Sequence, residues 1–104
     1  MKIYFHEHAL KRYKERLNTI DKSNINEYNW VEIDKLRNEI KRKGKFKRDP
    51  KRKDGFYCIV GNLKVYAGFE HENTLYVITC YPYTKSFGNY FKKLDTIEYP
   101  DLKD

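Results

Sequence analysis

Apolar residues recur at helical spacing near the start of the chain. After a short stretch that is typical of a strand, Lys2–Phe5, the residues Leu10, Tyr13 and Leu17 repeat every three to four positions. This spacing puts them on one side of a helix, and the lysines between them fall on the solvent side. We therefore predict a first amphipathic helix over His6–Leu17.

A second helix is predicted after a polar connecting segment. The segment Asn18–Asn29 is rich in Asn, Asp and Ser, which favours a loop. Asn29 is a good N-cap and Glu32 follows three residues later, as in a capping box, so we expect a helix from Trp30 that ends at Gly44. Its expected inner face consists of Trp30, Ile33, Leu36, Arg37 and Ile40.

Beyond residue 55 the hydrophobic period changes to two, which is typical of strands. The predicted strands are Phe56–Val60, Leu63–Phe69 and Thr74–Tyr81. Gly61-Asn62 suits a two-residue hairpin turn, because glycine tolerates the positive φ that such a turn requires, so antiparallel pairing follows.

The middle predicted strand has one apolar and one mixed face. Leu63, Val65, Ala67 and Phe69 point one way, whereas Lys64 and Tyr66 point the other way. We expect helices to cover the apolar face and the other face to stay partly wet. The wet face is then a candidate floor for binding.

The fold class predicted from this order is α+β, with two N-terminal helices packed on a three- to four-stranded antiparallel meander. A short fourth strand is expected over Ser86–Phe91, after the break at Pro82. Residues 1–91 are predicted to form a single domain, and residues 92–104 a loosely ordered C-terminal tail.

Positive charge is concentrated in one stretch. The net charge is +7, and Lys41 to Lys53 holds nine basic residues against a single acid. Such a local field favours polyanions, so we expect a basic loop that binds nucleic acid, although an acidic protein or plain solvation also fits. The candidate nucleic-acid-binding residues are Lys41, Arg42, Lys43, Lys45, Lys47, Arg48, Lys51, Arg52 and Lys53.

The cysteines and the hydropathy suggest a cytoplasmic protein. No apolar run approaches the roughly 20 residues of a membrane span, and MKIYFHEH lacks a signal-like apolar region. Cys58 and Cys80 could face each other across paired strands, but small buried thiols are the preferred interpretation.

Three side chains on the first predicted helix suggest phosphodiester chemistry. His8, Arg12 and Arg16 are successive i, i+4 neighbours, so they form one ridge beside the apolar stripe. Arginines can bind phosphate oxygens bidentately, and histidine exchanges a proton near neutral pH. The alternative is that the arginines pair with Glu15, Glu39 or the sheet while His8 is an ordinary surface residue.

The last predicted strand adds hydroxyls that could help at such a site. Thr79 and Tyr81 share one side, and hydroxyl groups there could orient a phosphate or a 2′-OH, although strand tyrosines often only pack. His6 and His8 would share a face on a strand but not on a helix, and no second ligand cluster follows. We therefore expect no metal and no other cofactor.

The string His8-Ala9-x-x-Arg12-x-x-x-Arg16, followed by a second helix, a meander and a strand with Val77, Thr79 and Tyr81, resembles a family of small bacterial and phage domains. That family is grouped with the barnase, EndoU, colicin and RelE-like (BECR) ribonuclease fold. The resemblance covers most of residues 3–83 and implies a metal-independent endoribonuclease in which the 2′-OH of RNA attacks and a 2′,3′-cyclic phosphate remains.

The resemblance also implies roles and partners. His8 would act as general base or acid, Arg12 and Arg16 would hold the scissile phosphate, and Thr79 and Tyr81 would assist. Many such enzymes are toxins that a partner protein keeps inactive, so RNA and an acidic antitoxin or host protein are the expected partners. The alternative from another class is a basic binding protein of a phage or mobile element that grips nucleic acid or inhibits a host protein without catalysis.

Overall fold

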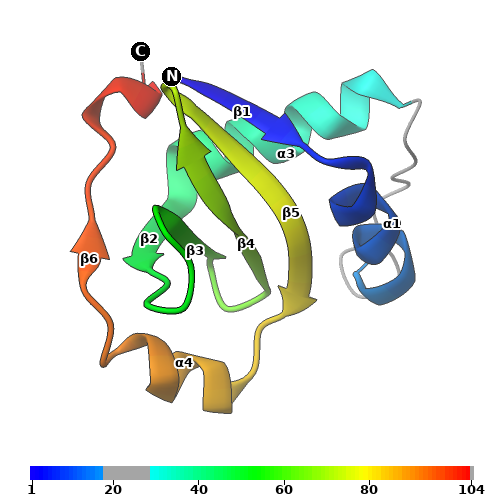
Figure 1. Ribbon diagram of the computed structural model, residues 1–104. Coiled ribbons are helices and arrows are strands. Elements are labelled where there is room, and N and C mark those ends of the chain that lie inside the picture. Colours follow the sequence, from blue (N-terminus) through cyan, green and yellow to red (C-terminus); the bar gives the residue numbers. More distant parts are fainter. Residues whose placement is uncertain (18–28, 104) are drawn as a thin grey trace.

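The computed structural model describes residues 1–17 and 29–103, which form helices and one sheet (Figure 1). In chain order the elements are β1 (Lys2–Phe5), α1 (Glu7–Arg16), α3 (Trp30–Lys43), β2 (Gly44–Arg48), β3 (Gly55–Val60), β4 (Lys64–His71), β5 (Thr74–Pro82), α4 (Lys85–Phe91), β6 (Thr96–Ile97) and the 3-10 helix η1 (Pro100–Lys103). The loop predicted at Asn18–Asn29 lies, except for Asn29, outside the described residues.

The α+β class is confirmed, but the sheet is larger and mixed. Its strand order is β1-β5-β4-β3-β2-β6. Strands β2 to β5 form the antiparallel meander, whereas β1 pairs with β5 in parallel, Lys2 opposite Thr74 and Phe5 opposite Val77. The expected number of strands, three or four, was therefore too low. β1 adds to one edge of the meander, next to β5, and β6 adds to the other edge, next to β2.

Side chains cap the starts of both N-terminal helices, and of these two caps only Asn29 was predicted from the sequence. The Nδ1 of His6 accepts a hydrogen bond from the backbone of His8 at 3.1 Å, which caps α1. The side chain of Asn29 accepts from the backbone of Glu32 at 3.2 Å and caps α3. Trp30 does not belong to the inner face as expected: it is 66% exposed, because it lies in the first turn beyond the packed stripe.

Helices α1 and α3 cover the opposite face of β4 from the one predicted. Tyr66 is fully buried and stacks on Tyr13 of α1, with 6.4 Å between ring centroids. Lys64 is also fully buried, with its Nζ 2.6 Å from Glu39 Oε1 on α3 and 3.0 Å from the hydroxyl of Tyr13. The assignment was wrong because this lysine has partners in the core.

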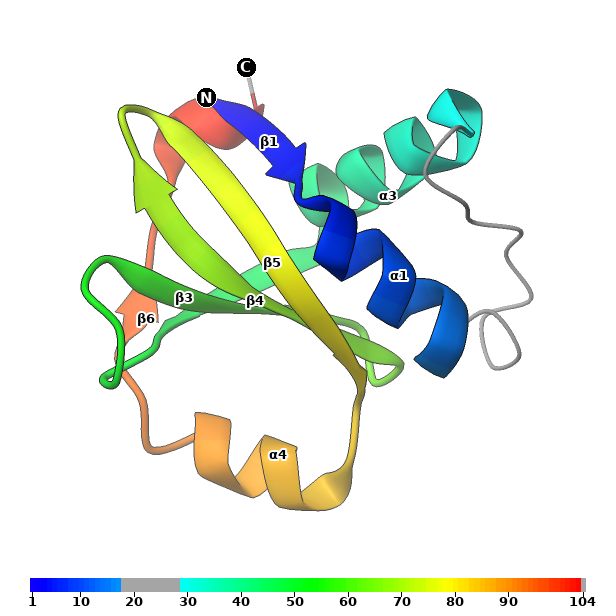
Figure 2. The same ribbon diagram turned by 45° about the vertical axis from the view of Figure 1, so that its right-hand side comes forward.

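The other face of the sheet carries Val65 and Ala67, and α4 packs on part of it (Figure 2). The strand predicted at Ser86–Phe91 is wrong, since these residues belong to α4. The Thr84 side chain accepts from the backbone of Phe87 at 3.2 Å, which caps the helix. Phe87 and Phe91 are four residues apart and stack at 5.7 Å.

The basic run is not the single loop that its composition predicted. Lys41 to Lys43 form the last turn of α3, residues 44–48 form β2, and only residues 49–54 form a turn. Strand β2 pairs with β3 along its whole length, from Gly44 opposite Val60 to Arg48 opposite Phe56. Alternation along β2 sends Lys45 and Lys47 to the face opposite the buried Phe46, and the run is divided among a helix end, a strand and a turn.

The residues after Phe91 are packed, in contrast to the expected loosely ordered tail. Phe46 of β2 pairs with Ile97 of β6. Tyr99 makes an edge contact with the ring of Phe46 at 4.9 Å, and Leu102 is 3% exposed within the core. The C-terminal segment thus closes the side of the core that β2 and α3 leave open.

Cys58 and Cys80 are buried free thiols, as the preferred interpretation expected. Each of them pairs with Tyr66, one from β3 and one from β5, so the strand β4 separates them. Burial raises the pKa of both thiols.

Candidate functional site

The histidine and arginine ridge of α1 lies beside the outer face of β5. His8, Arg12 and Arg16 line an open cavity of about 410 Å³ together with Thr79 and Tyr81. Thr79 and Tyr81 alternate with the buried Cys80, so they project from the face of the sheet that α1 and α3 do not cover. The residues singled out by sequence for chemistry are thus neighbours around one concavity.

Backbone contacts fix α1 against β5. The backbone of His6 donates to the carbonyl of Val77 at 2.9 Å, which extends the parallel pairing of β1 by one residue. Further along, the thiol of Cys80 contacts the carbonyl of Ala9 at 3.5 Å, and Arg16 Nη1 donates to the carbonyl of Cys80 at 3.0 Å. These contacts hold the helix at both ends, so the ridge keeps a fixed position over the strand.

Both arginines already have partners in the protein. Arg12 Nη1 lies 2.8 Å from Glu15 Oε2, an exposed i, i+3 pair, and this hydrogen bond lowers the pKa of the Glu15 carboxyl. The guanidinium carbon of Arg16 lies 5.0 Å from the centroid of the Tyr81 ring. A guanidinium offers five N–H donors, so each arginine keeps donors for a further anion.

Sequence reasoning did not place His6, Arg52 and Ile78 at the cavity that they line. His6 lines it because this residue caps the helix in an extended conformation, with φ −64° and ψ 147°, and so leaves the helical spacing that was assumed to separate it from His8. Arg52 also lines the cavity, although it comes from the turn between β2 and β3.

The turn that carries Arg52 is held by its own hydrogen bonds. Asp49 accepts from the backbone of Lys51 at 2.9 Å, and Gly55 donates to the carbonyl of Arg52 at 3.0 Å. Asp54 adopts a positive φ of 55°, a conformation that Asp tolerates better than most residues. The pairs Asp49-Pro50 and Asp54-Gly55 are typical of turns, but they do not indicate which surface of the protein this turn reaches.

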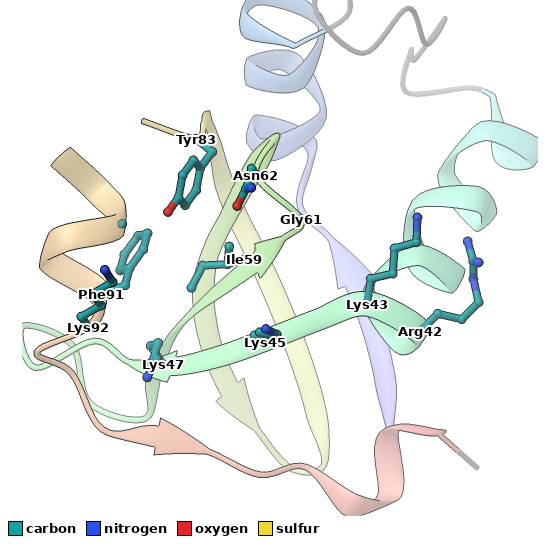
Figure 3. A pocket seen from close by; sticks show the side chains of 11 residues that line it. Arg42, Lys43, Lys45, Lys47, Ile59, Gly61, Asn62, Tyr83, Phe91 and Lys92 are labelled. Atoms are coloured by element: carbon teal, nitrogen blue, oxygen red, sulfur yellow. The ribbon is translucent and has the colours of Figure 1, made fainter. Parts of the chain in front are cut away.

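The other predicted nucleic-acid-binding residues gather in part at a second concavity, of about 630 Å³, which we call the basic groove (Figure 3). Arg42, Lys43, Lys45 and Lys47 line it, and Lys92 at the end of α4 joins them. Lys41, Arg48, Lys51 and Lys53 lie outside the linings of both the cavity and the groove.

The basic groove has an aromatic and apolar floor. Figure 3 shows Tyr83 and Phe91 close together on the side of α4, with Ile59 of β3 between them and β2. The hydroxyl of Tyr83 packs on Gly88, where an added Cβ would collide with it. Sequence reasoning missed Lys92, because no local pattern brings α4 next to β2.

No metal centre is evident in the part of the chain that the structure describes. Within residues 1–17 and 29–103, no three His, Cys, Asp or Glu side chains come together as potential ligands. The described helices also include none that is long and apolar enough to span a membrane.

Comparison of the chain with models of protein families, with curated proteins and with solved structures finds no match. The ribonuclease family resemblance therefore remains a prediction from the motif.

Proposed function

We propose that this protein is a metal-independent endoribonuclease, and that its active site is the cavity at α1 and β5. The observation that carries the proposal is the common lining of that cavity by two histidines, three arginines and two hydroxyl residues: His6, His8, Arg12, Arg16, Arg52, Thr79 and Tyr81. Cations supply charge for a phosphate and its transition state, and imidazole moves protons near neutral pH, so this set meets the needs of phosphodiester cleavage without a metal.

The proposed reaction uses the neighbouring hydroxyl of the RNA itself. His8 accepts the proton of a 2′-hydroxyl while its oxygen attacks phosphorus, the bond to the 5′-oxygen breaks, and the leaving oxygen takes a proton from water in the open cavity. Arg12 and Arg16 stabilise the charge on the phosphate, and the products are a 2′,3′-cyclic phosphate and a 5′-hydroxyl. DNA lacks the nucleophile and would bind without being cut.

Cleavage of single-stranded RNA in EDTA tests this proposal. We expect the wild type to cleave, and His8→Ala or Arg12→Ala to slow cleavage by about 100-fold or more, which is typical of the loss of a proton-transfer or charge-stabilising group. The matched control for His8 is His71→Ala, since His71 is exposed at the end of β4, away from the cavity. Lys14→Ala, an exposed position on α1, is the control for Arg12.

The proposal fails if purified wild type leaves RNA intact, or if His8→Ala cleaves as fast as His71→Ala. A toxin of this type would be stored with an inhibitor, and a net charge of +7 favours an acidic partner protein.

A second candidate function is nucleic-acid binding without cleavage. One observation favours it: Arg12 and Arg16 are both engaged, with Glu15 and with the carbonyl of Cys80, as in the structural alternative predicted from sequence. Intact RNA together with tight, salt-sensitive binding in the same experiment would support the binding protein and exclude the enzyme.

A further inference from the structure

The proposed active site and the basic groove lie at opposite ends of the same cross-strand row. Tyr81 of β5, which lines the cavity, pairs with Val65 of β4, Val65 pairs with Ile59 of β3, and Ile59 pairs with Lys45 of β2, which lines the groove. Strands lie about 4.8 Å apart, so three spacings separate Tyr81 from Lys45 by about 14 Å. Both sites therefore open on one face of the sheet.

Helix α4 contacts both sites on that face. Phe87 packs on the ring of Tyr81 at 5.6 Å, and Phe91 packs on the ring of Tyr57 at 5.0 Å. Phe91 also lines the groove, where Lys92 follows it. The helix thus fixes the groove relative to the cavity, and a ligand that reaches both meets a rigid surface.

The chemistry of the basic groove matches an unpaired nucleic-acid strand. Its cations can contact phosphates, and Tyr83 and Phe91 offer ring surface within the same concavity. Bases can stack on such rings only when they are not already stacked within a duplex. A groove that only bound an acidic protein surface would have no need of the apolar floor that Ile59 and the two rings form.

We propose that the basic groove is a second RNA site, which holds a phosphate and a base of a single strand whose scissile phosphate lies in the cavity. This inference rests on the proposed function, because it assigns the cavity to the cut bond. It makes single-stranded RNA that spans both sites the preferred substrate class. A dinucleotide has one phosphodiester, so it can occupy the cavity alone.

Lys45 and Lys92 are the groove lysines selected for substitution, and Lys47 is left unchanged. Lys47 donates to the hydroxyl of Thr96 at 3.0 Å and so helps to hold β6. Lys45 and Lys92 are exposed, and no ion pair is found for them among the described residues. The test variant is therefore Lys45→Gln/Lys92→Gln. The matched control is Lys14→Gln/Lys93→Gln, which removes the same charge from exposed positions outside both linings.

The first measurement is binding of a single-stranded RNA of about ten nucleotides, a length within the usual range of single-strand sites. It is made with both variants in the His8→Ala background, so that no cleavage interferes. Two lost phosphate contacts lower the slope of log affinity against log salt by about 1.4 and weaken binding about 25-fold at 0.1 M salt, at roughly 0.7 per contact. The control should bind like its parent.

The second measurement compares cleavage of a dinucleotide with cleavage of the longer RNA. We expect Lys45→Gln/Lys92→Gln to raise KM for the longer RNA about 25-fold and to leave dinucleotide cleavage unchanged. Circular dichroism of each variant checks that the fold is retained.

Equal weakening by the test and control variants would overturn the groove assignment, and so would an unchanged salt slope. Duplex RNA that binds as tightly as the single strand, through the same two lysines, would also overturn it. If the wild type cleaves nothing but the groove variant still loses single-strand binding, the groove stands and the proposed nuclease function fails. Single-stranded DNA that binds as well as RNA supports the groove, because phosphates and bases are common to both.

Discussion

At the scale of single residues, the buried Lys64 is the most costly feature of the core. Its ammonium is completely removed from water and is neutralised by Glu39 on α3, and it donates a hydrogen bond to the hydroxyl of Tyr13 on α1. Taking an ammonium out of water costs several kcal/mol, roughly offset here by the carboxylate and the hydroxyl. The three residues join both helices to β4, so they fix how the helices sit on the sheet.

The two ends of this ion pair should respond unequally to mutation. Glu39→Gln strands a fully buried ammonium, so we expect it to lower the free energy of unfolding by about 3 kcal/mol. Lys64→Met should cost less, because Glu39 is 26% exposed and can be hydrated. Urea unfolding of both variants at neutral pH measures the difference, and a smaller loss for Glu39→Gln than for Lys64→Met would contradict the account.

Residue spacing predicted the ridge of α1 but not the interior position of Lys64. Helical periodicity fixes which side chains share a face, and His8, Arg12 and Arg16 do line one cavity. The two-residue period along β4 separates two faces but does not tell which face the helices cover. Lys64 is counted as polar in the pattern, and the pattern does not show that a carboxylate in the core pairs with it. The partner Glu39 is 25 positions away in sequence, beyond any local pattern.

At the scale of elements, the C-terminal segment behaves as part of the core. β6 pairs with β2, and Leu102 in η1 belongs to the same buried cluster as Ile40 and Phe46. The segment also meets the start of the chain, where the N-terminal ammonium of Met1 donates to the carbonyl of Asp101 at 3.3 Å. Residues 96–103 therefore seal the core beside α3.

Leu102→Ala should destabilise the protein as a core substitution does. We expect a loss of about 2 to 3 kcal/mol in the free energy of unfolding, since truncation of a buried leucine removes apolar contact and leaves a cavity. The exposed neighbour provides the control, and Asp101→Ala should change the stability by less than about 0.5 kcal/mol. A loss for Leu102→Ala no larger than that for Asp101→Ala would mean that the segment is only loosely attached.

Element prediction succeeded where caps and period agreed and failed where the period was ambiguous. Asn29 marked the start of α3, whereas the capping role of His6 at α1 was not predicted. Phe87 and Phe91 are four residues apart, a spacing that fits one side of a strand as well as one side of a helix, and the capping role of Thr84 resolves it. Parallel pairing of β1 with β5 joins residues more than 70 positions apart and leaves no local signal.

At the scale of the whole molecule, burial of weak acids links stability to alkaline pH. Burial raises the pKa of Cys80 to about 12 and raises that of Cys58 further. The folded state therefore keeps both thiols protonated. In the unfolded chain the thiols lose these protons near their ordinary pKa of about 8.5. The stabilising contribution is complete below that pH and is lost as the pH rises toward the folded values.

We accordingly expect the free energy of unfolding to fall above about pH 9, at up to roughly 1.4 kcal/mol per pH unit for each buried thiol. Denaturant unfolding between neutral pH and pH 10 measures this slope. Cys80→Ala should reduce it by about half relative to the wild type. Stability that stays level over this range would contradict the burial of both thiols.

The fold of the whole molecule divides between two sites the positive charges that form a single run in the sequence. Arg52 turns toward the proposed active site, while Lys45 and Lys47 face the basic groove. Composition predicted a polyanion partner for this run, and its division between two sites follows from the pairing of β2 with β3.

The chemical structure of the cut RNA end shows whether the 2′-hydroxyl was the nucleophile. Mass spectrometry is applied to fragments of a single-stranded RNA after incubation with wild type or His8→Ala in EDTA. The account predicts that wild type leaves 5′ fragments that end in a 2′,3′-cyclic phosphate, lighter by one water than the linear phosphate. It predicts that His8→Ala forms these fragments at least about 100-fold more slowly, and that RNA with a 2′-deoxy sugar at the cut position yields none. Intact RNA with the wild type, or cut ends that carry a 5′-phosphate, would contradict it.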